Sequence, residues 1–471
     1  MRYVIVGASA AGIAAAEAIR ENDASGEMTM ISEEDSYPYA RIFLPLHATG
    51  RLDLERFYIR PPGWYDENGV DLILGDRASS LDLPNRRAIL KSGRTLPFDR
   101  LLLATGARPA RLGVPGEGLY GVTGLRTVRD SEVVRRRISW AREMGRVPHA
   151  LIVGGGLVSM KACEALVDAG VECTMVVASR RVLSRMLDEE VSSLVEERMK
   201  ERGVRVVLGV EVSYFGGDDG SAERRSNDAH PESPESGEPP DGLTYAVLST
   251  GERIACDIAI VGKGVTPDAI LFYGLDGIAP PEGPSPDVGI PVDERQRTVH
   301  PDVYAAGDVA SAKNRQTAKR EIIATWLVAR EQGRIAGLNM AGVDAVYEGG
   351  IRANAASFFG IATASVGDVA ARGSRQREYV VSDRPGSYRK MVLDLGPVRS
   401  DGESVIQGKI TEKTPTDVTG TPTGVVMAGR IGGAGVLRRL LAEGRGGEEV
   451  LRAISVDAVG YPVAVWNRLY I

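Results

Sequence analysis

The chain has 471 residues, too many for one hydrophobic core, and at about 150 residues per domain it predicts roughly three domains. Hydrophobic residues at 43% and charged residues at 25% are ordinary globular usage, which excludes a globally disordered chain. The 57 basic and 63 acidic residues give a net charge of −6, so the basic excess of a dedicated nucleic-acid-binding protein is missing.

The first residues predict a strand, a glycine turn and a helix. Residues 2–6 are a short apolar strand, residues 7–12 are a tight turn of small residues, and the helix runs to about Arg20. Such a turn lets the backbone approach a pyrophosphate, and the helix start offers it N–H groups and a positive dipole end. A signal peptide has a similar outline, but Glu17 and Arg20 continue the helical pattern without a cleavage site. We therefore expect these residues to belong to the fold.

The next strand, residues 28–32, ends in two acidic residues. Glu33 and Glu34 lie about twenty residues past the glycine turn, where a dinucleotide-binding fold places the carboxylate that holds a ribose hydroxyl. The spacing therefore predicts a first dinucleotide site.

The same pattern occurs a second time in the middle of the chain. Residues 150–153 predict a strand, 154–159 a glycine turn, 160–169 a helix and 171–177 the next strand. A lone glycine pattern is a weak signal, but two copies in the same context favour two dinucleotide-binding folds. The alternative is two α/β units whose glycine turns hold no ligand.

Several further segments complete the organisation of the chain. Residues 101–109 and 303–309 are apolar strands that run into small-residue turns, as strand ends facing a ligand do. Residues 216–242 are rich in Gly, Pro, Ser, Asp and Glu and predict a disordered insertion. It joins two expected antiparallel strands, 204–212 and 243–248.

The pattern changes from about Tyr347 onward. Strands are expected at 387–395 and 424–431, followed by a helix at 436–443. These elements predict a separate α+β domain.

Cysteine, histidine and apolar patterns exclude several kinds of site. The three cysteines form no C-x-x-C pair, and the four histidines show no H-x-x-x-H spacing, so we expect no metal site and a reducing, cytoplasmic setting. Buried cysteines commonly act as small apolar fillers, which is the role we expect of Cys163, Cys173 and Cys256. No run of about 18 apolar residues occurs, so no membrane span is expected.

Four segments in fixed order resemble the pyridine nucleotide-disulfide oxidoreductase family of two-dinucleotide flavoproteins. They are residues 7–12, 104–107, 154–159 and 306–308. Residues 37–41 and the terminal domain are most similar to the branch of nitrite reductase large subunits, rubredoxin and ferredoxin reductases, and NADH oxidases.

The resemblance implies an α/β fold with two Rossmann-like dinucleotide-binding domains. An FAD-binding domain, 1–115 and 264–345, is interrupted by an NAD(P)-binding domain, 116–263, which carries the insertion at 216–242. A C-terminal α+β interface domain, 346–471, often mediates dimerisation in the family, so a homodimer is expected.

The resemblance also implies the residues of the FAD site. The first glycine turn would cradle the pyrophosphate, with Glu33 or Glu34 on the ribose, and Asp308 would hydrogen-bond the ribityl chain or the pyrophosphate region. Arg41 would lie near the flavin, and the backbone at Ala78 near the adenine. The full set is Gly7, Ser9, Ala11, Gly12, Glu33, Glu34, Arg41, Ala78, Thr105, Gly106, Gly307, Asp308, Thr325 and Trp326.

The NAD(P)H site implied by the resemblance departs from the usual pattern. Its residues are Gly154, Gly156, Leu157, Val158, Ser159, Arg180 and Arg181. Relatives usually have Gly at position 159, and strand 174–177 lacks the acid that would bind the adenosine 2′-hydroxyl. Arg180 and Arg181 can pair instead with the 2′-phosphate of NADPH, or they can form an ordinary solvated loop.

Two further departures concern the chemistry. Ile42 stands where disulfide-using relatives carry a redox cysteine, so neither a redox disulfide nor a sulfenate is expected. Lys161 stands where relatives place a glutamate close to the nicotinamide and flavin. A cation there would favour the anionic reduced flavin and raise its potential, unless the side chain reaches solvent instead.

Together these features predict an FAD-dependent NAD(P)H:acceptor oxidoreductase. Hydride passes from NAD(P)H to flavin N5, and the electrons go directly to a small molecule or to a rubredoxin- or ferredoxin-like protein. Arginines 135–137 either dock such a partner or are simply solvated. The alternatives are an NADH oxidase and, from another class, a non-catalytic flavin-binding scaffold or redox-responsive partner protein.

Overall fold

The computed structural model describes residues 1–217, 242–273, 288–371, 376–384, 387–395 and 420–455. The expected insertion at 216–242 thus lies almost wholly outside the described residues. The chain divides into two compact units, one of Met1–Phe43, Asp53–Pro109 and Val265–Arg352, the other of Leu44–Leu52, Ala110–Gly264 and Ala353–Ile471.

The first unit is built on a parallel five-stranded sheet with the order β19-β7-β1-β2-β3. The strands are β1 (Arg2–Val6), β2 (Glu27–Ile31), β3 (Val70–Ile73), β7 (Arg100–Leu103) and β19 (Val303–Ala305). Alternate residues of β1 point to opposite faces, so Val4 and Val6 join one buried cluster while Tyr3 and Ile5 join another. Both faces of β1 are therefore buried.

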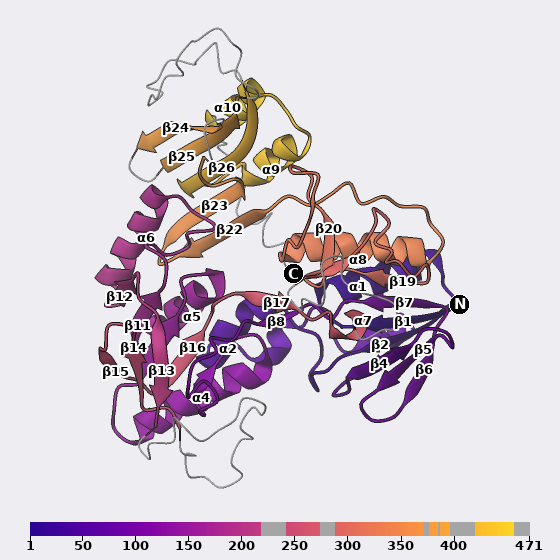
Figure 1. Ribbon diagram of the computed structural model, residues 1–471, viewed down its shortest axis with the longest axis horizontal. Helices are drawn as coiled ribbons and strands as arrows, with labels where there is room; N and C mark the ends of the chain where they lie inside the picture. The colour runs from indigo at the N-terminus through magenta and orange to yellow at the C-terminus, as the bar shows by residue number, and fades with distance from the viewer. Residues whose placement is uncertain (218–241, 274–287, 372–375, 385–386, 396–419, 456–471) are drawn as a thin grey trace. The chain divides into compact units, whose positions relative to one another are not determined.

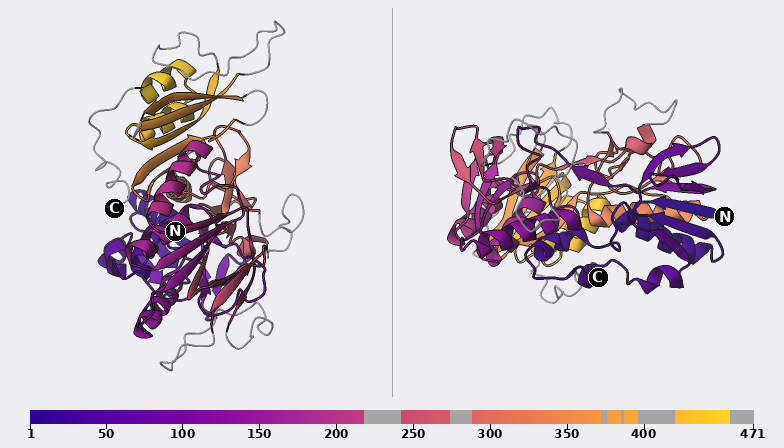
Figure 2. Two further views of the ribbon diagram at one scale, coloured as in Figure 1. Left: turned by 90° about the vertical axis from the view of Figure 1, so that its left-hand side faces the viewer. Right: turned by 90° about the horizontal axis from the view of Figure 1, so that it is seen from below.

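Two helices of this unit pack unusually closely, α1 (Ala10–Asn22) and α8 (Trp326–Met340). A Cβ on Gly333 would lie 2.1 Å from the Ala11 carbonyl oxygen, and one on Gly337 would lie 2.4 Å from that of Ala15. Glycine is needed at both positions of α8 because the two backbones touch. Figures 1 and 2 show the two helices side by side.

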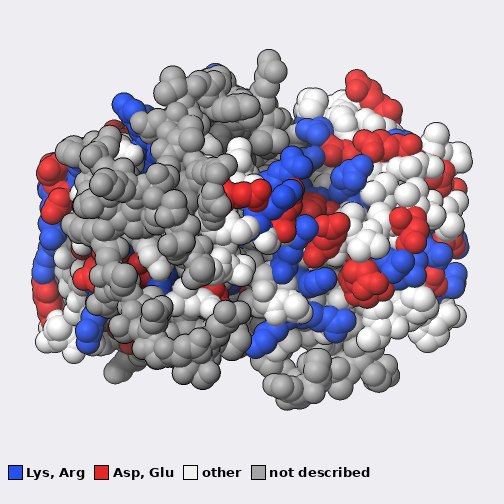
Figure 3. Space-filling view, turned by 90° about the horizontal axis from the view of Figure 1, so that it is seen from above, with Lys and Arg blue, Asp and Glu red and all other residues white. Residues whose placement is uncertain are grey.

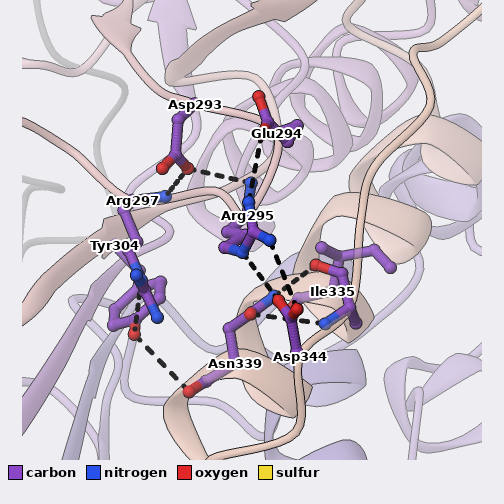
Figure 4. A network of polar contacts seen from close by, with 9 residues as sticks. Asp293, Glu294, Arg295, Arg297, Tyr304, Ile335, Asn339 and Asp344 are labelled. Atoms are coloured by element: carbon purple, nitrogen blue, oxygen red, sulfur yellow. Dashed lines mark hydrogen bonds and ion pairs between the residues drawn. The ribbon is translucent and has the colours of Figure 1, made fainter.

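A polar network fixes the point where β19 begins and α8 ends (Figure 4). The Asp293 carboxylate accepts the backbone N–H groups of Arg295 and Arg297, both at 2.8 Å, and Arg295 pairs with Asp344 at 2.7 Å. Asn339, near the end of α8, donates to the Ala345 carbonyl beyond the helix at 2.7 Å. The expected site residues lie at the other ends of these two elements, Asp308 after β19 and Thr325 before α8.

Small elements complete this unit. They are η1 (Arg41–Phe43), η2 (Leu54–Phe57), α3 (Gly63–Glu67), β4 (Ala78–Asp82), β5 (Arg87–Leu90), β6 (Thr95–Pro97), β8 (Ala107–Pro109), β17 (Val265–Pro267), α7 (Ile270–Tyr273), β18 (Ile290–Pro291), β20 (Ala310–Lys313) and β21 (Arg320–Glu321).

The second unit contains another parallel sheet, with the order β12-β11-β10-β16-β9. Its strands and helices are β9 (Val122–Thr123), β10 (His149–Val153), β11 (Glu172–Val177), β12 (Arg205–Leu208), β16 (Ile258–Val261), α2 (Leu44–Ala48), α4 (Val128–Glu143), α5 (Leu157–Asp168) and α6 (Glu189–Glu201). The expectation of one strand over 204–212 is wrong. Gly209, with φ +71°, ends β12, and a second strand, β13 (Val212–Gly216), pairs antiparallel with β14 (Tyr245–Leu248), which β15 (Arg253–Ala255) follows.

The C-terminal part of this unit is an antiparallel sheet with the order β22-β23-β26-β25-β24. The elements are β22 (Ala353–Phe358), β23 (Ile361–Gly367), β24 (Gln376–Arg384), β25 (Ser387–Asp394), β26 (Thr421–Gly429), α9 (Ala434–Ala442) and α10 (Gly447–Ser455). Helices α9 and α10 pack on this sheet (Figures 1 and 2). The predicted fold class, two Rossmann-like folds and an α+β region, is confirmed.

Two surface properties bear on partners. In the view of Figure 3, basic and acidic side chains of the described residues lie interspersed, and neither sign covers the face alone. Among the helices of the described residues, none has both the length and the apolar character that crossing a bilayer requires.

Candidate functional site

The first glycine turn connects β1 to α1 and leaves the start of that helix open. Gly7 has φ +109°, and a Cβ there would lie 2.1 Å from the Ala104 carbonyl oxygen. A Cβ on Gly12 would lie 2.0 Å from the Gly7 carbonyl oxygen, so both positions exclude any side chain. Ser9 is the N-cap of α1, yet its side chain makes no capping hydrogen bond. The helix start therefore keeps backbone N–H groups and a positive dipole end for an anion.

Other expected residues follow the neighbouring parallel strands. Thr105 and Gly106 come after β7, Glu33 after β2, and Asp308 after β19. Because these strands are parallel and adjacent, their carboxyl ends meet at one edge of the sheet, where open α/β sheets bind ligands. Ala11 also lies at this edge, because a Cβ on Gly307 would lie 3.1 Å from the Cβ of Ala11.

Arg41 is held in this region by a cluster of polar side chains. It pairs with Glu34 at 3.0 Å, and the Tyr39 hydroxyl donates to the same carboxylate at 2.5 Å. Burial alone would lower the pKa of Arg41, but its interactions with Tyr39, Glu34 and Asp308 outweigh burial and raise it. The interaction with Asp308 brings two residues far apart in the sequence into one electrostatic group, and Arg41 stays charged.

The two acids after β2 have different surroundings. Glu34 forms an ion pair with Arg41 and accepts a hydrogen bond from Tyr39. Glu33 is 61% exposed, and its ion pairs with Arg77 and Arg108 are long, at 3.8 and 3.9 Å. Glu33 is therefore the better candidate for a ribose hydroxyl, because a ligand can replace weak, solvated ion pairs at little cost.

Hydrogen bonds fix the turns after β7 and β19. The Thr105 hydroxyl donates to the Asp268 carbonyl at 2.7 Å, so it is used within the protein. The Gly307 N–H donates at 2.8 Å to the side-chain carbonyl of Gln332, a buried residue of α8. Sequence reasoning missed Gln332. A polar residue within the otherwise apolar face of a helix was the available signal.

The remaining expected residues of this unit lie in different settings. Thr325 is the N-cap of α8 without a side-chain capping bond, and Trp326 begins that helix and packs on the buried cluster beneath it. Ala78 begins β4, beside a register shift, and is itself buried. The chain just before it lies beside the end of β2, because the Asp76 N–H donates to the Ser32 carbonyl at 3.1 Å and Arg77 pairs with Glu33 at 3.8 Å.

The second glycine turn connects β10 to α5 and reproduces the close packing with different residues. Gly154 has φ +106°, and a Cβ there would lie 2.5 Å from the Gly262 carbonyl oxygen. Ser159 is buried on the first turn of α5, and a Cβ on Gly262 would lie 2.1 Å from its Oγ. Gly262 thus leaves the space that the Ser159 side chain fills. Sequence reasoning missed Gly262, although a glycine directly after strand β16 was the available signal.

This second helix start is also open. Gly156 is the N-cap of α5 and has no side-chain capping bond, and Leu157 and Val158 begin the helix, with Val158 47% exposed. The loop after β11 folds back on the turn, because the Leu183 N–H donates to the Gly155 carbonyl at 2.7 Å. Arg180 is exposed on this loop, and Arg181 is half-buried, donating to the Ser184 carbonyl at 3.3 Å.

Lys161 is directed to partners within its own unit. Its ammonium pairs with Glu164 on the same helix and donates to the Ser357 carbonyl of β22 at 3.1 Å. The side chain is 32% exposed. Glu164 therefore supplies a counter-charge beside the expected cation.

The arginine run on α4 is not a surface patch. Arg137 is buried and donates to the Asp257 carbonyl at 2.7 Å and to the Leu243 carbonyl, and Arg135 donates to the His47 carbonyl. Within the run only Arg136 is exposed. The interpretation of Arg137 as a docking or solvated cation is wrong, because its guanidinium joins three segments of the unit.

The cysteine chemistry agrees with the sequence. Cys163, Cys173 and Cys256 are all free and buried. Burial raises the pKa of Cys256 to about 12, and the hydrogen bond between Cys163 and Cys173, together with burial, raises that of Cys163. At neutral pH neither is a thiolate, so neither is a reactive nucleophile. Ile42, at the position of the redox cysteine, is 52% exposed.

Each unit thus offers the elements that a dinucleotide needs. Side-chain-free backbone at both glycine turns admits a pyrophosphate, and an open helix start faces it. The first unit also has the exposed carboxylate of Glu33 after β2, and the second has Arg180 and Arg181 after β11. These residues fit FAD in the first unit and NAD(P)H in the second.

Comparisons with known proteins place the chain in a family. The model of the family described as pyridine nucleotide-disulphide oxidoreductase matches residues 1–333. The chain is 28% identical over 394 residues to the NADH-dependent phenylglyoxylate dehydrogenase subunit epsilon of Aromatoleum evansii, covering 83% of this chain and 85% of that protein. It is 30% identical over 333 residues to the ferredoxin–NAD(+) reductase component of the biphenyl dioxygenase system of Paraburkholderia xenovorans (strain LB400), and this match covers 70% of this chain and 72% of that protein.

A solved structure shares the fold. The NAD-dependent persulfide reductase from A. fulgidus superimposes with a TM-score of 0.77 at 23% identity, over 95% of this chain and 77% of that one. The chain belongs to the pyridine nucleotide-disulphide oxidoreductase family, which confirms the resemblance and, with it, an oxidoreductase that uses FAD and NAD(P)H.

Proposed function

We propose that this protein is a reductase that carries electrons from NAD(P)H to an acceptor without a protein thiol. The observation that supports it most is the group of residues at one edge of the first unit's sheet: the open start of α1, Glu33, and Arg41 with Asp308. When bound there, FAD would accept a hydride from NAD(P)H and release its electrons to the acceptor.

The chain's own residues would bind and orient the reactants. The turn 7–12 would hold the pyrophosphate by backbone N–H groups, and Glu33 would bind the adenosine ribose. Asp308 would hydrogen-bond the ribityl chain or the pyrophosphate region. Arg41, kept charged by Glu34, would balance the negative charge of the site. Gln332 would keep the turn at Gly307 in the conformation that presents Asp308.

The acceptor is proposed to react at the flavin itself. Ile42 supplies no thiol, and the described cysteines are buried, so electrons have no protein relay of that kind. The similarity to a ferredoxin–NAD(+) reductase component supports an acceptor of the ferredoxin or rubredoxin class. An NADH oxidase is disfavoured because Ile42 cannot form a sulfenate.

The non-catalytic alternative is disfavoured by the second glycine turn. Ser159 stands where relatives usually have glycine, but Gly262 accommodates the serine and the close helix–strand contact is kept. We further propose NADPH as the preferred coenzyme, because Arg180 and Arg181 follow β11 where an acid would favour NADH.

The organisation of the chain is proposed as follows. Residues 1–115 and 264–345 form the FAD domain, 116–263 the NAD(P) domain, and 346–471 an interface domain that makes a homodimer. The buried free thiols support a cytoplasmic, reducing setting.

Anaerobic stopped-flow reduction tests the proposal. FAD-loaded protein mixed with NADPH should bleach within seconds, and a ferredoxin or rubredoxin should restore the oxidised flavin spectrum. Protein that stays oxidised over minutes with both coenzymes is the result expected of a scaffold.

A further inference from the structure

A buried group of charges joins the C-terminal sheet to the start of α6. The Lys390 ammonium lies 2.9 Å from Asp188 and 3.0 Å from Glu378, and the side chains of Lys390 and Asp188 are each 2% exposed. The Tyr388 hydroxyl donates to the same Asp188 oxygen at 2.7 Å. Because buried charges need partners, the position of Asp188 depends on β25, which carries both Tyr388 and Lys390.

Asp188 also fixes the start of α6. Its other carboxylate oxygen accepts the Val191 N–H at 3.1 Å and so caps the helix. Two side chains of α6 then hold Val182: Glu196 accepts its N–H at 3.0 Å, and the Ser192 hydroxyl donates to its carbonyl at 2.9 Å. The loop from β11 to α6 is therefore fixed at its middle and at its end.

The loop in turn contacts the second glycine turn. Leu183 follows Val182 in the left-handed conformation, φ +52°, which is uncommon for leucine, and its N–H donates to the Gly155 carbonyl at 2.7 Å. A continuous series of contacts thus runs from Tyr388 and Lys390 to the turn that would hold the coenzyme pyrophosphate. Arg180 and Arg181 lie on the same loop.

A second attachment lies on α5. Glu164 accepts the Phe359 N–H at 2.7 Å, and Lys161 donates to the Ser357 carbonyl at 3.1 Å. The C-terminal sheet therefore contacts both α5 and the start of α6, the two helices that flank the proposed coenzyme site.

We propose that Tyr388 and Lys390 are positioning residues for NAD(P)H, acting through Asp188 on the loop that receives the adenosine end of the coenzyme. This inference rests on the proposed function, because it takes residues 154–159 and the loop after β11 as the coenzyme site. The C-terminal region then has a part in coenzyme affinity as well as in any interface.

The test measures coenzyme binding separately from chemistry. NADP⁺ is titrated calorimetrically into FAD-loaded wild type, Tyr388→Phe and Lys390→Met, and limiting rates of flavin reduction are measured with NADPH. Tyr388→Phe removes one hydrogen bond to a charged group and should weaken NADP⁺ binding about three- to tenfold. Lys390→Met leaves the buried carboxylate of Asp188, and the more exposed one of Glu378, without their cation and should weaken NADP⁺ binding more. The limiting rate of reduction should not change, since neither residue touches the reacting atoms.

Arg146→Met is the matched control. It also removes a cation from a buried carboxylate, Asp257, at 2.8 Å, but this pair lies where β10 and β16 begin, at the opposite edge of the sheet. It should lower the thermal midpoint without changing the NADP⁺ dissociation constant.

The outcomes separate the two proposals. Weakened binding in Tyr388→Phe but not in Arg146→Met supports the inference. Wild-type affinity in Tyr388→Phe and in folded Lys390→Met overturns it, as does an equal loss in Arg146→Met. If wild type binds NADP⁺ but NADPH does not reduce its flavin, the proposed function is contradicted. The NADP⁺ dissociation constants of the variants can still be compared, so the inference is still tested.

Discussion

The two glycine turns differ at the same position of the helix that follows them. In the first unit the side chain is missing from the helix, at Gly12, which lies against the Gly7 carbonyl. In the second unit the helix carries Ser159, and the side chain is missing from Gly262, directly after β16. The helix position that holds glycine in the first unit can therefore hold serine in the second, where the residue after the neighbouring strand has no side chain.

The two units differ more at the ribose end. After β2 stands a carboxylate, Glu33, whereas β11 ends in a buried valine, Val177, and is followed by Arg180 and Arg181. The backbone that would accept a pyrophosphate is alike in both units. The side chains that would contact the adenosine ribose have opposite charges, negative in the first unit and positive in the second.

The largest effect is expected from Gly12→Ala. The new Cβ would lie 2.0 Å from a backbone oxygen, so the turn must open, with a loss of about 3 kcal/mol in the free energy of unfolding. FAD should be lost during gel filtration, as measured by the flavin absorbance per chain. Gly63→Ala is the control, because its Cβ would meet only Glu67 at 3.8 Å. A Gly12→Ala protein with a full complement of FAD would show that this contact is not needed.

The second unit allows a rescue experiment. Gly262→Ala places a Cβ 2.1 Å from the Ser159 Oγ and should cost about 2 kcal/mol of stability in urea denaturation. Ser159→Gly removes that oxygen, so the double variant should recover most of the loss, with a coupling of about 1 to 2 kcal/mol. Losses that simply add would mean that the two residues do not compensate each other.

A smaller effect is expected where the ribose charges differ. Arg180→Ala with Arg181→Ala should raise the KM for NADPH about tenfold, the lower end for a charge-assisted contact because Arg180 is exposed. The KM for NADH should change less. Arg198→Ala, an exposed arginine on α6, is the control. Equal changes for both coenzymes, or a wild-type preference for NADH, would remove the arginines from the site.

The smallest effect concerns Lys161. If it acts on the flavin, Lys161→Glu should lower the flavin midpoint potential by about 30 mV, which is about 1.4 kcal/mol for two electrons. Lys161→Met should fall between that variant and wild type. The effect is modest because Glu164 already balances part of the charge. A spectroelectrochemical titration with one midpoint for all three proteins rejects this role.

The sequence was sufficient for the local features of the two folds. Strand β1, helix α1, strand β10 and helix α5 form where apolar runs and glycine turns predict them, because each is set by residues close together in the chain. The helices begin three residues earlier than expected, α1 at Ala10 and α5 at Leu157, inside the expected turns. Residues that follow strands could be assigned to one edge of a sheet for the same reason. Both glycine turns are of this kind.

Pairs that are distant in the sequence could not be predicted in this way. Gly307 and Gln332 are 25 positions apart, Ser159 and Gly262 are 103 apart, and Tyr388 lies 200 positions from Asp188. No period or spacing relates such residues, since only the folded sheets bring them together. The choice between Glu33 and Glu34 likewise required knowledge of where Arg41 lies.

The central claim is electron transfer through FAD without a protein thiol, and an anaerobic titration tests it most directly. NADPH is added in steps to FAD-loaded protein while flavin absorbance is recorded. Complete bleaching is expected at one NADPH per FAD, because the flavin alone takes up the two electrons. A requirement for two NADPH per FAD would reveal a second two-electron acceptor, such as a cysteine pair or a sulfenate, and would contradict the claim.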